Sequence, residues 1–146
     1  TALDDILMET YESVRLQAEG ITLKIERCEP VFVHGNPVRL RQVFINLIDN
    51  ALKHSPPGSA VSIALWREKD KVKALIRDCG PGVSEKDLKR IYEPFFRAPA
   101  SKRLPGAGLG LTIVSWIVQE HAGDMGIESS PGNGTTVTLS FPAIIV

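Results

Sequence analysis

A helix with clearly marked ends places the strongest constraint on what this chain can fold into. Asn36 can cap a helix, and Pro37 suits the first helical position, where its missing N–H is not needed. Two prolines and a glycine over residues 55–58 stop the helix, so the sequence predicts a helix over residues 37–54. Its apolar positions share one face and are expected to enter the core: Leu40, Phe44, Leu47, Ile48 and Ala51.

The rest of the chain alternates between helical and strand-like patterns. We expect helices over 2–19 and 109–120, a short helix from about Ser84, and a mobile loop over 95–105. Strands are expected over residues 21–25, 31–33, 60–66, 71–77, 125–129 and 135–141. This order favours an α+β fold, a two-layer α/β sandwich in which a mixed, mostly antiparallel sheet packs against helices.

Composition limits the class of protein. The chain has 146 residues, 43% of them hydrophobic, which is enough for one domain with a sizeable core. Its 17 basic residues equal its 17 acidic ones, so nothing indicates a nucleic acid partner or a charged membrane surface. The longest apolar stretch, 109–118, is too short to span a bilayer, and no signal-peptide pattern opens the chain. Cys28 and Cys79 fit no metal or redox spacing, which favours a reduced, cytoplasmic domain.

A polar stripe runs along the predicted helix over 37–54. Gln42, Asn46, Asn50 and Lys53 recur at helical spacing, although asparagine is mildly unfavourable inside a helix. Taken alone, a solvated stripe is the simpler interpretation. The alternative is a magnesium–nucleotide site, because neutral amide oxygens suit Mg²⁺ and leave its charge available to phosphate oxygens. Lys53 would then add a positive charge for the phosphates.

Two glycine-rich segments follow predicted elements. The segment 78–82, Asp-Cys-Gly-Pro-Gly, is either a plain tight turn or a base-binding site in which buried Asp78 accepts a hydrogen bond from an exocyclic amine. The segment 106–111 precedes a helix and can form a phosphate cradle, although it matches no Walker loop. Before it, two phenylalanines could anchor a loop while Arg97 reaches a phosphate; a surface arginine is the alternative.

Taken in order, these motifs resemble those of one family. The segments 46–54, 78–82, 95–97 and 106–111 are similar to the N, first glycine, F and second glycine boxes of sensor histidine kinases. Similar lead-in and closing segments lie at 33–42, 121–123 and 132–136. The resemblance covers nearly the whole chain and implies the Bergerat ATP-binding fold of gyrase, Hsp90-type and MutL-type ATPases. It implies one catalytic and ATP-binding domain over residues 1–146.

The resemblance also implies roles for individual residues, with ATP and Mg²⁺ as cofactors. Asn50 should hold magnesium with Asn46 beside it, and Asn46, Lys53 and Arg97 should serve catalysis. Asp78 should bind the adenine amino group, and residues of about 95–106 should form the ATP lid. The other expected nucleotide-binding residues are His54, Gly80, Gly82, Val83, Gly106, Gly108, Leu109, Gly110, Leu111 and Thr135. Two positions depart from the family pattern: Asn36 replaces an aspartate, and Cys79, which we expect to be a small buried residue, replaces an asparagine.

No histidine of this chain matches the family's phosphoacceptor. His34, His54 and His121 each lack an acidic neighbour on the C-terminal side. The resemblance therefore implies transfer of the ATP γ-phosphoryl group to a histidine on a separate dimerisation domain, and from there to a response regulator. We expect a monomer with no direct membrane contact and little phosphoryl transfer on its own; the full-length protein could be anchored in the inner membrane.

Three other functions fit the sequence less well. The chain could be a nucleotide-responsive binding module without catalysis, although both asparagines, Lys53 and Arg97 are present. It could be a serine kinase of the anti-sigma type, but the complete second glycine box and the phenylalanine pair fit sensor kinases better. A structural domain with fortuitous glycines would require every motif to be accidental.

Overall fold

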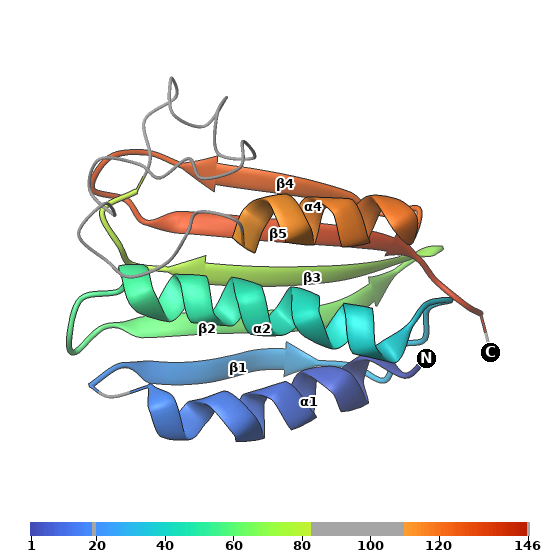
Figure 1. The fold of residues 1–146 in the computed structure, drawn as a ribbon, viewed down its shortest axis with the longest axis horizontal. Helices are drawn as coiled ribbons and strands as arrows, with labels where there is room; N and C mark the ends of the chain where they lie inside the picture. The colour runs from blue at the N-terminus through green and yellow to red at the C-terminus, as the bar shows by residue number, and fades with distance from the viewer. Residues whose placement is uncertain (19, 83–109, 146) are drawn as a thin grey trace.

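The computed structural model describes residues 1–18, 20–82 and 110–145, which form a sheet covered on one face by helices (Figure 1). In chain order the elements are α1 (Leu3–Val14), the short 3-10 helix η1 (Arg15–Gln17), β1 (Thr22–Cys28), α2 (Pro37–His54), β2 (Ala60–Glu68), β3 (Lys71–Asp78), α4 (Gly110–Glu120), β4 (Asp124–Ser129) and β5 (Thr135–Pro142). The predicted two-layer α/β sandwich is confirmed.

The sheet has the strand order β1-β2-β3-β5-β4. Strand β1 runs parallel to β2, and the other neighbours pair antiparallel, so the sheet is mixed and mostly antiparallel as predicted. The β2–β3 pair closes through a tight turn in which Lys69 has a φ of 57°. None of the helices in the described part of the chain is long and apolar enough to cross a membrane.

The core lies between the sheet and the helices. Alternate residues of β2 point into it, since Val61, Ile63 and Leu65 are fully buried. The five apolar residues that we predicted for the core face of α2 are all buried, and Val43 joins them. Asn36 caps α2 as expected: its side-chain oxygen accepts hydrogen bonds from the backbone N–H groups of Val38 and Arg39.

Some predicted elements differ from the structure. The strand expected over 31–33 is only an isolated bridge between Ala2 and Phe32. Its partner is the short segment before α1, so the pairing consists of a few backbone hydrogen bonds. The first helix ends at Val14 and gives way to the 3-10 turn, earlier than the predicted boundary. The short helix near Ser84 and the loop over 95–105 lie outside the described residues.

The arrangement of the elements gathers several segments at one end of the molecule (Figure 1). The C-terminal ends of α2 and β3, the N-terminal end of α4 and the β4–β5 turn lie at this end. Both chain termini lie at the opposite end. The described parts of the predicted motifs, which are the end of α2, the segment 78–82 and the start of α4, therefore lie at one end of the sheet, although they are spread along the sequence.

Candidate nucleotide-binding site

Asp78 is the last residue of β3, and its carboxylate is buried with 7% exposure. Its Oδ1 atom accepts hydrogen bonds from the backbone N–H of Gly80 at 2.8 Å and of Thr135 at 3.2 Å. Burial raises the pKa of Asp78, and those two N–H groups and nearby His54 offset part of the increase. Among the described residues Oδ2 has no hydrogen-bond partner, yet it is not sealed from solvent, so it can accept a proton donor from a ligand.

The glycines around Asp78 allow backbone segments to approach one another. A Cβ atom on Gly80 would collide with the carbonyl oxygen of His54, and one on Gly134 would collide with the carbonyl oxygen of Asp78. Gly82 has a φ of 75° and leaves no space for a Cβ beside the Ser130 carbonyl. We predicted Gly80 and Gly82 as nucleotide-binding residues. In the described structure the neighbouring backbone already requires them to be glycine.

The helix α2 contributes its polar side at the same end. Asn46 and Asn50 are half-buried, and the structure gives their amide side chains no hydrogen bond within the described residues. The described part of the chain holds no cluster of three His, Cys, Asp or Glu residues that could bind a metal alone. Neutral amide oxygens are ligands of the kind that Mg²⁺ takes together with phosphate oxygens.

Lys53, which we predicted to contact the phosphates, forms an ion pair in the structure. Its Nζ atom lies 2.9 Å from Oδ2 of Asp49, one helical turn earlier, and the two side chains are 40% and 52% exposed. An exposed pair of this spacing contributes only about 0.3–0.5 kcal/mol. A bound phosphate could therefore displace Asp49 at little cost. The spacing of four residues makes this pair visible in the sequence.

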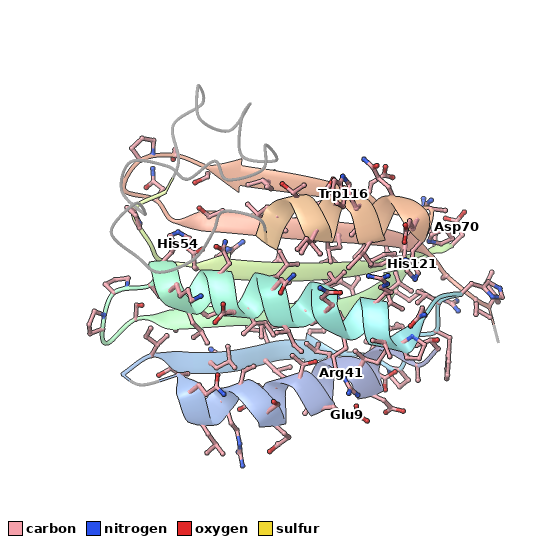
Figure 2. The ribbon with its side chains drawn as sticks, viewed as in Figure 1. Glu9, Arg41, His54, Asp70, Trp116 and His121 are labelled. Atoms are coloured by element: carbon pink, nitrogen blue, oxygen red, sulfur yellow. The ribbon has the colours of Figure 1, made fainter. Side chains whose placement is uncertain are left out.

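His54 ends α2 beside this site (Figure 2). Its Nδ1 atom lies 2.7 Å from the backbone oxygen of Asn50, which fixes the ring against the last turn of the helix. His121, whose ring is also hydrogen-bonded to the backbone, lies at the far end of α4 (Figure 2). Its two ring nitrogens contact the Ile117 carbonyl and the Asn36 N–H, so it takes no part in this site.

The β4–β5 turn supports the site from the other side. Thr135 opens β5 directly opposite Asp78, and the backbone N–H of Gly132 donates to the carbonyl of Pro81 at 2.8 Å. Ser129 donates a hydrogen bond to the carbonyl of Gly134, and its hydroxyl lies 2.8 Å from that of Thr135. The sequence predicted this turn and Thr135, but it gave no signal for Ser129.

The remaining predicted residues divide into two groups. Gly110 is the first residue of α4, and Leu111 is half-buried against the core. Val83, Arg97, Gly106, Gly108 and Leu109, and the whole predicted lid over 95–106, lie outside the described residues.

Cys79 is exposed, so its predicted burial was wrong. Asp78 turns inward as the last residue of β3, and the next side chain in the chain turns outward. The Sγ atom of Cys79 lies 3.6 Å from the carbonyl oxygen of Ala60.

Comparison with known proteins decides the family. The profile of the family described as "Histidine kinase-, DNA gyrase B-, and HSP90-like ATPase" matches residues 35–145. The chain belongs to this ATPase family. The adaptive-response sensory kinase SasA of Nostoc sp. is 34% identical over 139 residues, which cover 94% of this chain and 34% of SasA.

Solved structures of the same ATPase family agree with this assignment. The mycobacterial sensor histidine kinase MprB matches with a TM-score of 0.92 and 28% identity, over 100% of this chain and 99% of that one. Full-length ShkA, solved with AMPPNP, matches with a TM-score of 0.84 and 26% identity, over 100% of this chain and 31% of ShkA. The chain thus spans about a third of the length of the curated kinases that it matches.

Proposed function

We propose that this chain is the ATP-binding catalytic domain of a sensor histidine kinase, which transfers the γ-phosphoryl group of ATP to a histidine of a separate dimerisation domain. The observation that carries the proposal is the hydrogen bonding of the buried Asp78 carboxylate. One oxygen of its buried carboxylate is held by two backbone N–H groups, and the other is left to accept a donor. Such a carboxylate suits the amino group of adenine and rejects the oxo group of guanine.

The phosphates would lie between α2 and the N-terminus of α4. That N-terminus begins at Gly110 and carries backbone N–H groups that favour anions. Asn50 and Asn46 would hold Mg²⁺, which when bound neutralises charge on the phosphate oxygens. Lys53 would exchange Asp49 for a phosphate oxygen, and Arg97 would make a second contact. These residues orient the phosphates and stabilise the charge that develops during transfer.

The acceptor histidine is expected on another domain because none of the three histidines suits the role. His54 and His121 use ring nitrogens in hydrogen bonds to the protein backbone. His34 is exposed but lies beside the opposite end of α2 from His54. A dimerisation domain of the same kinase would supply the histidine, and a response regulator would then receive the phosphoryl group. We also propose that this domain lies in the cytoplasm.

Calorimetric titration with ATP and GTP in the presence of Mg²⁺ tests the nucleotide site. The chain is expected to bind ATP and not GTP, and Asp78→Asn is expected to abolish the binding. Asp70→Asn is the matched control, since Asp70 is exposed in the turn at the opposite end of β3. Failure of the chain to bind ATP at any magnesium concentration would refute the proposal.

Adding a histidine-bearing helical domain with labelled ATP tests the transfer step. The label is expected on the added domain as an acid-labile phosphohistidine, and not on this chain alone. Binding of ATP without any transfer would indicate a nucleotide-responsive binding module instead. An acid-stable phosphoserine on a partner would indicate the anti-sigma type of kinase.

A further inference from the structure

We propose that Ser129 is a positioning residue for adenine recognition, because its hydroxyl holds the peptide group that in turn holds Asp78. This inference rests on the proposed function, in which Asp78 receives the adenine amino group. Ser129 is the last residue of β4 and pairs with Thr135, the first residue of β5. Thr135 pairs on its other side with Asp78, so the three residues form a row across the sheet.

Two hydrogen bonds end on the same peptide group. The hydroxyl of Ser129 donates to the carbonyl oxygen of Gly134 at 2.8 Å. The N–H of Thr135 donates to Oδ1 of Asp78 at 3.2 Å. That carbonyl and that N–H belong to one planar unit, so a tilt of the unit changes both hydrogen bonds together. A hydrogen bond at the carbonyl also polarises the unit and strengthens its N–H as a donor.

The Thr135 N–H has a different role from the second donor to Asp78. Gly80 is only two residues from Asp78, so its N–H moves with the local turn. Thr135 is 57 residues away, and its N–H ties the carboxylate to the sheet. Gly134 is buried and packs against the Asp78 carbonyl, and within the described ranges Ser129 is the side chain whose hydrogen bond sets the tilt of this peptide. Loss of its hydroxyl would let the carboxylate rotate and Oδ2 leave its position.

The same hydroxyl fixes the proton of Thr135. The oxygens of the two hydroxyl groups lie 2.8 Å apart, and either could donate. Ser129 has one proton, which goes to the Gly134 carbonyl, so Thr135 must donate to Ser129. Thr135 is then left with acceptor lone pairs only. Asp78 and Thr135 would therefore both present acceptors to a base, which suits an amino group.

The variants Ser129→Val and Ser129→Thr give a matched pair, since valine and threonine have nearly the same shape and both suit a strand. We would titrate each with MgATP and with the magnesium complex of purine riboside triphosphate, which lacks the amino group. Ser129→Val is expected to weaken ATP binding by about three- to tenfold and to weaken binding of the analogue by less than about twofold. Ser129→Thr is expected to keep the wild-type preference for ATP.

Ser140→Ala is the control, because Ser140 is a half-buried serine near the other end of β5. It should leave both affinities unchanged. Equal losses for the two nucleotides in Ser129→Val would show a purely structural role and overturn the inference. If Ser129→Val kept the wild-type preference for ATP over the analogue, the inference would also be overturned. The proposed function would still stand in either case, provided that the wild-type chain binds ATP. Absence of ATP binding to the wild-type chain would instead refute the proposed function itself.

Discussion

Two glycines of the β4–β5 turn offer a test of how closely the turn is fitted to Asp78. Gly132 and Gly134 both have a positive φ, 80° and 73°, so alanine at either position costs roughly 1–2 kcal/mol in backbone strain. Only Gly134 faces a neighbour. A Cβ on it would overlap the Asp78 carbonyl oxygen and lie 3.2 Å from Cα of Cys79, whereas a Cβ on Gly132 has nothing within 4 Å.

Gly134→Ala should therefore destabilise the chain more than Gly132→Ala. Overpacking against a backbone that cannot move freely adds roughly 1–3 kcal/mol to the strain that both variants share. With a typical urea dependence of unfolding, this difference lowers the midpoint of Gly134→Ala by about 0.5–1.5 M relative to Gly132→Ala. Urea denaturation followed by circular dichroism measures both midpoints.

Nucleotide binding gives an independent measurement on the same two variants. The collision displaces the backbone of Asp78, so Gly134→Ala is expected to weaken ATP binding by at least about tenfold, while Gly132→Ala stays within about threefold of the wild type. Equal urea midpoints for the two variants would refute the reasoning, because they would show that a Cβ placed against the Asp78 carbonyl does not lower the free energy of unfolding.

Three further predictions follow from the structure. Because burial raises the pKa of Asp78 above 3.8, the folded chain holds that proton more tightly than the unfolded chain, and the contribution of Asp78 to the free energy of unfolding falls as pH rises from about 4. The stability of Asp78→Asn relative to wild type should therefore increase over the same range in urea titrations at several pH values, and a flat difference would contradict the raised pKa. Asp49→Asn should lower stability by less than about 0.5 kcal/mol and strengthen ATP binding about twofold by releasing Lys53; weaker binding in calorimetry would show that the pair serves the site. Phe44→Ala should cost about 3–5 kcal/mol in thermal or urea unfolding, while Ile45→Ala, on the exposed side of α2, should cost far less.

The elements that the sequence predicted well are those whose ends are marked locally. Pro37 and the prolines after His54 define α2 to the residue, because capping and proline geometry depend only on near neighbours. The strand expected over 31–33 was wrong for the opposite reason. Its apolar alternation is real, since Val31 and Val33 are buried, but a strand also needs a partner of sufficient length.

The position and burial of Asp78 could be predicted from the sequence, whereas its contacts could not. Burial of Asp78 followed from its place at the end of an alternating strand. The role of Ser129 could not be seen, because it depends on the register that places β4, β5 and β3 side by side. A serine near a turn looks the same in a sequence whether it faces water or a peptide of the site. The roles of the predicted nucleotide ligands remain predictions for the experiments above.

Residues near both termini are held together at the end of the fold opposite the C-terminal end of β3 (Figure 1). Phe32 pairs with Ala2 and accepts a hydrogen bond from the backbone of Ile144, so both ends are fastened to one segment, away from the nucleotide site (Figure 1). The 18 residues of α2 separate that end from the site by about 27 Å. A swing of about 30° around the fastened end would carry the site through roughly 14 Å. A small rotation about this end of the domain is thus enough to displace the candidate nucleotide-binding site over a large distance.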